Sequence, residues 1–271
     1  MKTRIIAGSA LIFALLVLVL AVPKVVAALV FGGLMSIGVY ELLYRTGLVR
    51  HRRLVSYTAV MAFAMTMWSY FGAVHAWLVL LVLLFTMVLF GEMMADHVKV
   101  RVSMLGECML AGVVIPFLLT AVIRILSMKL GRYVILIPFI IACINDAGAY
   151  FVGMRYGKHK LSPVVSPNKT IEGMLGGMAA AVIGMMIYAL LLQLLDGFRV
   201  NYFYALIYGV FGAAAGVFGD LCFSIIKRQT GIKDYGNLIP GHGGVFDRLD
   251  SMMTVAPLIE VLLLLLPVAV E

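Results

Sequence analysis

Residues 202–226 read YFYALIYGVFGAAAGVFGDLCFSII, and this stretch decides the class of fold. Its only charged residue is Asp220, close to the end that Lys227 and Arg228 follow. A helix that crosses the hydrocarbon core of a bilayer needs about 20 mostly apolar residues. The stretch is therefore long enough and apolar enough to cross a membrane as a single helix.

Similar apolar runs recur along the whole chain of 271 residues, of which 63% are hydrophobic and only 13% are charged. In an ordinary soluble domain roughly a quarter of all residues are charged. The low share in this chain indicates that most of its surface faces lipid. We predict an all-α, polytopic integral membrane protein with nine transmembrane helices. The expected spans are residues 5–21, 22–43, 54–71, 74–92, 104–127, 132–153, 170–196, 202–226 and 250–269.

The first two spans are separated only by Pro23 and Lys24. One helix over residues 5–43 would be far longer than a bilayer is thick, so a tight helical hairpin is expected here. An alternative is a cleaved signal peptide over residues 1–21, because Lys2 and Arg4 precede the apolar run.

The basic residues are distributed unevenly between the two sides of this arrangement. Of the 21 Lys and Arg residues, 16 fall at the amino terminus or in the loops after the second, fourth, sixth and eighth spans. The other side receives Lys24, Arg124, Lys129, Arg132 and Arg199. Basic loops stay in the cytoplasm. We therefore expect a multi-pass protein of the plasma (inner) membrane with a cytoplasmic amino terminus and an outside carboxyl terminus.

No internal repeat is evident, and we divide the chain into three segments by position. Residues 1–103 are expected to form a scaffold of four spans, and residues 104–169 the fifth and sixth spans with a cytoplasmic loop. Residues 170–271 carry the last three spans and most of the polar motifs. The formal net charge of +8 comes without a basic run that alternates with aromatic residues, so nucleic acid is not an expected partner.

Charged residues inside membrane spans are costly and are therefore candidates for function. Glu41, Glu92 and Glu260 lie near span ends, and we interpret them as interfacial or helix-pairing carboxylates. Asp146 and Asp220 lie at cytoplasmic span ends beside polar loops, which makes them stronger candidates.

The span that carries Asp220 has a stripe of small residues at steps of three and four. The stripe consists of Gly209, Gly212, Gly216 and Gly219. Small residues let a neighbouring helix approach closely. Asp220, Ser224 and Lys227 continue this face at helical spacing, so the carboxylate is expected to point into a packed seam.

The densest polar stretch follows at once and reads SIIKRQTGIKDYGNLIPGHGGVFDRLD from Ser224 to Asp250. It combines cations suited to phosphate oxygens with carboxylates suited to Mg²⁺ and with glycines that allow close backbone approach to an anion. The cations are Lys227, Arg228, Lys233 and Arg248, the carboxylates are Asp234, Asp247 and Asp250, and Gly243 and Gly244 follow His242. Together they predict a metal–nucleotide site.

Two shorter elements lie nearby in the chain. Residues 166–173, SPNKTIEG, are expected to open a helix whose free N–H groups and Lys169 attract phosphate. Residues 145–153, NDAGAYFVG, place Asp146, Tyr150 and Gly153 on one helix face.

Taken together, these three elements resemble the CDP-diacylglycerol synthase family, also called phosphatidate cytidylyltransferase. The resemblance covers about a fifth of the chain, and residues 224–250 match the family signature at its fixed positions. It implies a homodimeric membrane enzyme that condenses CTP with phosphatidate, using Mg²⁺ and possibly a second cation. By matching positions it implies Asp220 and Asp247 as metal ligands. We expect Asp146, Asp234 or Asp250 to complete or orient the metal ligands, and Asp146 is taken as the further candidate ligand.

The expected catalytic residues are Asp220, Asp247, Lys227 and Arg248. The expected substrate-binding residues are Ser166, Asn168, Lys169, Ser224, Arg228, Lys233, Asp234, His242, Gly243, Gly244 and Asp250. Two rival classes stay open: an ion-coupled transporter with glycine-rich helices, and another CTP-using lipid enzyme such as a polyprenol kinase.

Overall fold

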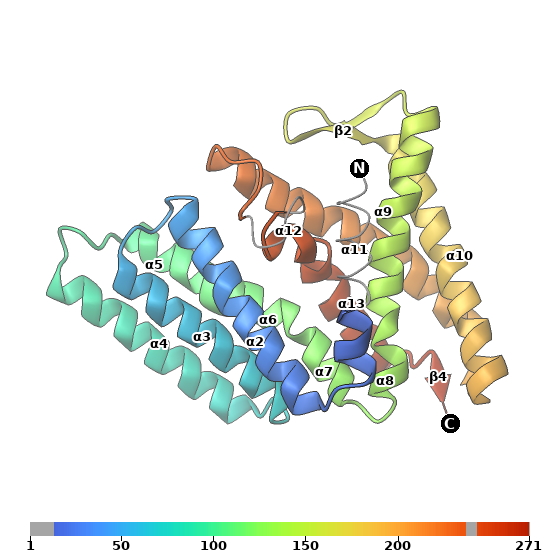
Figure 1. Cartoon of the computed structure of the whole chain (residues 1–271), viewed down its shortest axis with the longest axis horizontal. Helices are drawn as coiled ribbons and strands as arrows, with labels where there is room; N and C mark the ends of the chain where they lie inside the picture. The colour runs from blue at the N-terminus through green and yellow to red at the C-terminus, as the bar shows by residue number, and fades with distance from the viewer. Residues whose placement is uncertain (1–13, 237–242, 271) are drawn as a thin grey trace. The chain divides into compact units, whose positions relative to one another are not determined.

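The computed structural model describes residues 14–236 and 243–270, and these are mostly helical (Figure 1). Six of the described helices or joined helical segments are long and apolar enough to cross a membrane. They are Lys24–Arg45, His75–Ala95, Val102–Ser127, Gly131–Tyr156, Ile171–Leu195 and Tyr202–Gln229. The chain is thus a polytopic helical membrane protein.

Each of these six helical segments matches a predicted span to within a few residues at either end. Two further predicted spans correspond to α3 (Arg52–Tyr70), which is more polar, and to α13 (Met252–Leu265), which is shorter. The first predicted span lies largely outside the described residues, and its described part, residues 14–20, is helical.

The chain divides into two compact units, and each is described by itself. The first consists of Met1–Lys129 and Lys227–Leu249, and the second of Leu130–Ile226 and Asp250–Glu271. Helix α11 (Tyr202–Gln229) is continuous along the boundary in the sequence, with its last three residues in the first unit.

In the first unit, α2 (Lys24–Tyr40) packs along α3 (Figure 1). The remaining elements of the first unit are a π-helical turn η1 (Glu41–Arg45), α4 (His75–Ala95), α5 (Val102–Met109), a second π-helical turn η2 (Leu110–Val114), α6 (Ile115–Leu119), α7 (Ala121–Ser127) and α12 (Phe246–Leu249). Close packing is set by small residues: a Cβ on Gly32 would lie 2.8 Å from the Phe63 ring, and one on Gly112 would lie 2.8 Å from Thr58.

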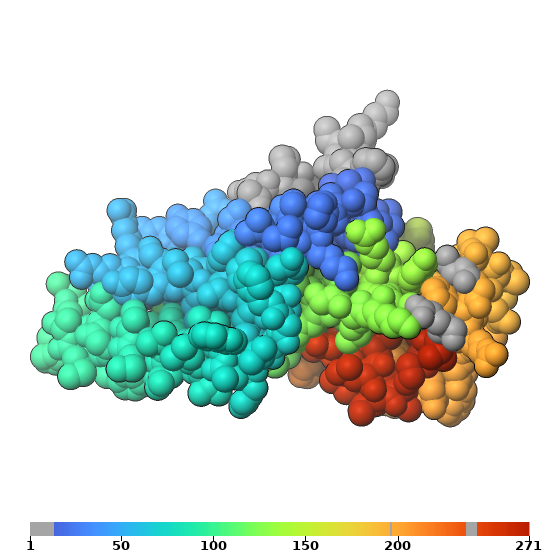
Figure 2. All heavy atoms as spheres, turned by 90° about the horizontal axis from the view of Figure 1, so that it is seen from below, coloured from blue at the N-terminus to red at the C-terminus, as the bar shows by residue number. Residues whose placement is uncertain are grey.

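Helix α4, the teal part of Figure 2, lies on the face shown there. Its apolar side chains are exposed along its length. Only Phe85 and Leu89 of this helix are buried, while Trp77, Met87 and Met94 are more than 60% exposed. Such a surface is unfavourable in water but normal against lipid, where no hydrophobic penalty applies. The exposure of α4 therefore supports immersion of the first unit in a bilayer.

In the second unit, α9 and α10 lie side by side over much of their length (Figure 1). The unit consists of α8 (Gly131–Val134), α9 (Leu136–Tyr156), β1 (Lys160–Ser162), β2 (Ser166–Thr170), α10 (Ile171–Asp196), β3 (Arg199–Val200), most of α11, α13 and β4 (Ala269–Val270). Antiparallel pairs form between β1 and β2 and between β3 and β4.

The sequence predicted that residues 166–173 open a helix, and this is only half correct. Helix α10 begins at Ile171, with Thr170 as its N-cap, but residues 166–170 form strand β2. Pro167 lacks an N–H, which an edge strand of a two-stranded pair tolerates. The two strand pairs are the exceptions to the all-α prediction among the described residues.

Candidate active site

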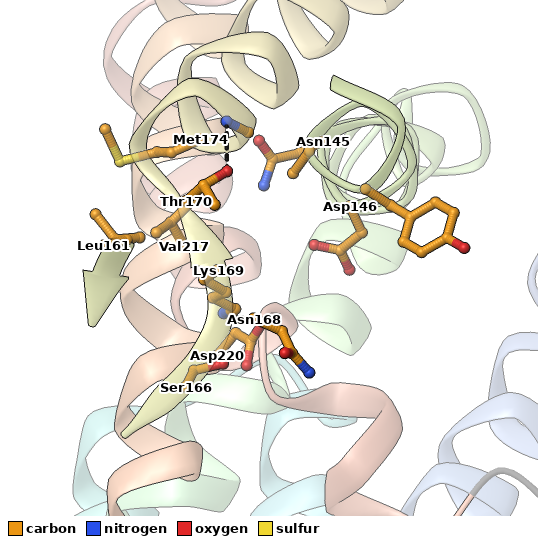
Figure 3. Close-up of a pocket in the computed structure, with 13 residues that line it drawn as sticks. Asn145, Asp146, Leu161, Ser166, Asn168, Lys169, Thr170, Met174, Val217 and Asp220 are labelled. Carbon is orange, nitrogen blue, oxygen red and sulfur yellow. Dashed lines mark hydrogen bonds and ion pairs between the residues drawn. The ribbon is translucent and has the colours of Figure 1, made fainter. Parts of the chain in front are cut away.

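The second unit contains a cavity of about 330 Å³ between α9, the β1–β2 hairpin, α10 and α11. Figure 3 shows polar side chains from three of these elements directed toward one space. The polar residues that line it are Asn145, Asp146, Tyr150, Ser166, Asn168, Lys169, Thr170 and Asp220. Five of the residues predicted to bind substrate or metal thus line a single cavity, although they come from three separate parts of the sequence.

Asp220 is the centre of the polar contacts in this cavity. One of its carboxylate oxygens forms an ion pair with the ammonium of Lys169. The other accepts a hydrogen bond from the hydroxyl of Ser224 at 3.2 Å, one turn further along α11. The side chains of Lys169 and Asp220 are 27% and 24% exposed, so both remain accessible from the cavity.

The β1–β2 hairpin holds Lys169 in place. Glu172, in the first turn of α10, accepts hydrogen bonds from the backbone N–H groups of Lys158 at 3.0 Å and His159 at 3.2 Å. The Thr170 hydroxyl accepts the N–H of Gly173 at 3.1 Å and so caps α10. Because the hairpin is fixed at both of its ends, Lys169 reaches Asp220 from a defined backbone position.

The predicted close packing at the glycines of α11 is confirmed, but Asp220 lines the cavity and does not point into the packed seam. A Cβ on Gly209 would lie 2.7 Å from the backbone of Val182 in α10, and one on Gly216 would lie 3.3 Å from Val255 in α13. One on Gly219 would lie 2.6 Å from the carbonyl oxygen of Asp250. This close packing fixes the rotation of α11 and hence the direction of the neighbouring Asp220.

A second group of predicted residues meets in the first unit around Asp247, which is 8% exposed. Its Oδ2 accepts the N–H groups of Tyr235 and Gly244, each at 2.8 Å. Its Oδ1 lies 3.1 Å from the ammonium of Lys227, which also lies 5.6 Å from the centre of the Tyr235 ring. Gly243 has a positive φ of 87°, so it brings the chain around Asp247 in a conformation that favours glycine.

The same segment contacts Glu41, which the sequence interpretation placed among interfacial or helix-pairing carboxylates. Glu41 is only 2% exposed, and its Oε2 accepts the N–H of Val245 at 2.7 Å. Its partner is a loop far along the chain, which no local pattern in the sequence indicates.

Comparison with known proteins gives this arrangement a family. The model of the family described as "Cytidylyltransferase family" matches residues 2–266. The chain belongs to the cytidylyltransferase family. The match extends across both units, so it covers the helices of the first 140 residues as well as the polar motifs.

Individual members of the family are similar over long stretches. A protein named phosphatidate cytidylyltransferase from Bacillus subtilis is 34% identical over 98% of this chain and 98% of its own length. Proteins of the same name from Staphylococcus haemolyticus and Staphylococcus aureus are 43% and 44% identical over 134 residues, which is about half of each chain.

The remaining predicted site residues take less central places. Arg228, Lys233, Asp234 and Arg248 are exposed. Asp250 accepts the N–H of Ser251 at 2.8 Å in the second unit. His242 lies outside the described residues.

Sequence reasoning also missed partners that surround the predicted ones. Asn145 is 1% exposed, lines the cavity beside Asp146, and its Oδ1 has no hydrogen-bond partner within the described part of the chain. Its place directly before Asp146 in a polar interruption of an apolar run was the available signal. Tyr235 is also fully buried beside Asp247, although it is surrounded by polar residues in the sequence.

Proposed function

We propose that this protein transfers the cytidylyl group of CTP to phosphatidate, which gives CDP-diacylglycerol and pyrophosphate. Membership of the cytidylyltransferase family supports the nucleotidyl transfer. The Bacillus subtilis relative, similar over nearly its whole length, supports phosphatidate as the acceptor. The protein is accordingly a nucleotidyltransferase of phospholipid biosynthesis.

The observation that carries the proposal is the cavity of the second unit, where the Lys169 ammonium and the carboxylates of Asp146 and Asp220 share one space. CTP and phosphatidate are both anions and repel each other. A site for their reaction must supply positive charge and hold the attacking oxygen of phosphatidate in line with the α-phosphorus and the leaving oxygen of CTP. A cavity with both a cation and oxygen ligands for a metal meets this need.

The acceptor requires little activation. The second pKa of a phosphate monoester is about 6, so the phosphatidate phosphate is largely ionised at pH 7. One of its oxygens attacks the α-phosphorus of CTP while the bond from that phosphorus to the bridging oxygen of the β-phosphate breaks. The electron pair leaves with pyrophosphate, and no proton has to be removed from the acceptor. Binding and orientation are therefore the main tasks of the protein.

Cationic residues serve these tasks. Lys169 binds a phosphate group in the cavity, and Lys227 and Arg248 stabilise the charge that develops on the leaving pyrophosphate. The other residues that we propose to contact substrate are Ser166, Asn168, Ser224, Arg228, Lys233, Asp234, His242, Gly243, Gly244 and Asp250. Hydroxyl and amide groups orient the phosphates, and the glycines allow backbone N–H groups to approach them.

The donor set fits Mg²⁺, with a second cation as a further possibility. In nucleotide sites this ion uses one or two carboxylates together with phosphate oxygens and water. In the second unit, Asp220 and Asp146 line one cavity and would hold such an ion there. In the first unit, Asp247 is the proposed metal ligand. When bound, the ion supplies charge neutralisation at the phosphates.

We further propose how the enzyme is placed in the cell. The charge bias supports nine transmembrane helices in the plasma membrane, with the amino terminus and the active site facing the cytoplasm and the carboxyl terminus outside. CTP then arrives from the cytosol and phosphatidate from the leaflet. Segments 1–103, 104–169 and 170–271 would act as scaffold, link and catalytic part, and the working form would be a homodimer.

The deciding test supplies purified protein with labelled CTP, Mg²⁺ and phosphatidate in mixed micelles. The expected products are a CMP-bearing lipid and pyrophosphate in equal amounts. Release of CDP with phosphorylation of a lipid alcohol would instead identify a lipid kinase. The absence of any CTP-dependent product, together with ion-coupled uptake in vesicles, would favour the transporter class.

A further inference from the structure

Glu41 has no role in the proposed reaction, yet it is one of the most buried ionisable groups in the described chain. Its side chain is 2% exposed, and it stands where α2 passes into the π-helical turn η1. π-Helical turns are rare and occur frequently at functional sites. A buried carboxylate without partners is strongly unfavourable, so its partners explain its presence.

The strongest partner of Glu41 is the backbone of residues 224–250, the stretch that matches the family signature and is here called the signature segment. Oε2 of Glu41 accepts the Val245 N–H at 2.7 Å, a length typical of a charge-assisted hydrogen bond. Arg45 lies 3.9 Å from Oε1, but its side chain is 44% exposed, so this ion pair is screened by solvent. The buried bond to Val245 is therefore the contact that Glu41 is placed to make.

The glycines of the segment make room for this carboxylate. A Cβ at Gly236 or at Gly244 would overlap the carboxylate of Glu41. One turn before Glu41, a Cβ at Gly38 would lie 2.8 Å from the ring of Phe246. Gly236 on one side of residues 237–242, and Gly244 and Phe246 on the other, thus pack against one face of α2 and η1. Glycine is required both in that face, at Gly38, and in the segment packed against it.

Asp247 also holds the signature segment, but its carboxylate oxygens are in addition proposed to bind a metal ion. They accept the N–H groups of Tyr235 and Gly244 and pair with Lys227. If Asp247 and Lys227 act on metal and nucleotide, as the proposed function requires, the segment needs an acceptor that takes no part in the reaction. Glu41 is such an acceptor, since its carboxylate is enclosed by the segment itself.

We propose that Glu41 is a positioning residue: it fixes the backbone at Gly244 and Val245 so that Asp247 and Lys227 keep their places for cytidylyl transfer. This inference rests on the proposed function. It gives the scaffold half of the chain a direct part in shaping the active site. The assigned role needs an oxygen acceptor at position 41 and does not need full negative charge.

The test compares two substitutions of similar size. Glu41→Gln keeps an acceptor oxygen, whereas Glu41→Met fills the same volume without one. Loss of a hydrogen bond to a charged acceptor corresponds to about tenfold or more in rate, so we expect Glu41→Met to lower kcat by at least that factor. The KM for CTP should change less, and Glu41→Gln should stay within about threefold of wild type.

Glu92 provides the matched control, because it also lies in the first unit and pairs with an arginine, Arg53, at 3.7 Å. Glu92→Gln and Glu92→Met should both leave kcat unchanged. Rates are compared at equal amounts of monodisperse protein with the same melting temperature, so that loss of folded enzyme is not read as loss of kcat. Equal activity of Glu41→Met and Glu41→Gln would overturn the inference.

Hydrogen exchange gives a reading that does not depend on activity. In Glu41→Met, the amide hydrogen of Val245 should exchange at least about tenfold faster, because its acceptor is gone, while peptides from α4 stay unchanged. Unchanged exchange at Val245 would refute the positioning role. If wild-type protein makes no CDP-diacylglycerol, the proposed function fails, and exchange alone decides whether Glu41 holds the segment.

Discussion

Single carboxylates with two or three partners shape both groups of predicted site residues. Asp220 binds Lys169 and Ser224, and Asp247 binds Lys227 and two backbone N–H groups. Carboxylates that are already held by donors keep their orientation before any substrate arrives. Pre-organisation of this kind lowers the cost of assembling charged groups around two polyanions.

Replacing Asp220 by Asn should lower turnover by about a hundredfold or more, because the neutral amide weakens both the metal set and the pairing with Lys169. Product formation from labelled CTP measures the loss. The protein should still insert and show normal thermal unfolding, since the side chain is partly exposed. Asp96→Asn is the control, as Asp96 lies outside the six long helices and pairs with nearby Lys99. Near-normal activity of the Asp220→Asn variant would exclude Asp220 from the catalytic set.

At the scale of helices and strands, small residues decide how closely the elements of the second unit approach. A Cβ at Gly148 of α9 would lie 2.6 Å from the Cβ of Ala180 in α10, a contact that requires the helices to move apart. Because α9 carries Asp146 and the hairpin before α10 carries Lys169, this spacing also sets the width of the cavity.

Gly148→Ala should therefore destabilise the protein by about 1–3 kcal/mol, the usual cost of overpacking. Gly91→Ala in α4 is the matched control: an added Cβ there meets no described atom within 4 Å, so the higher helix propensity of alanine should leave stability equal or slightly raised. Thermal unfolding in detergent micelles compares the two variants. Equal melting temperatures would show that α9 and α10 do not need glycine at this contact.

The sequence predicts some of these elements well and others poorly, for physical reasons. Long apolar runs locate α9, α10 and α11 to within a few residues, because bilayer thickness fixes the length of a span. Strand β2 and the turn η1 were not predicted, since neither changes the hydropathy of its segment. The contact of Glu41 with Val245 was not predicted because the two residues are 204 positions apart in the chain.

At the scale of the whole molecule, the charge bias of the loops makes a topological prediction. Single cysteines are introduced at Val164, which is 86% exposed, and at Lys129, after replacement of Cys108, Cys143 and Cys222. We expect an impermeant thiol reagent on intact cells to label position 129, and position 164 only after permeabilisation. Labelling of position 164 from outside would reverse the proposed orientation.

The contact between Glu41 and Val245 also has a consequence for biosynthesis. A ribosome that adds about 5–20 residues per second needs roughly 10–40 seconds to extend the chain by the 204 residues that separate them. During that interval the acidic side chain has been made but its backbone donor has not. Until residue 245 has been translated, Glu41 of the nascent chain therefore lacks its buried backbone donor and has the exposed Arg45 as its ion-pair partner. A truncated chain that ends before residue 245 would never gain that donor and should be a preferred substrate for membrane proteases.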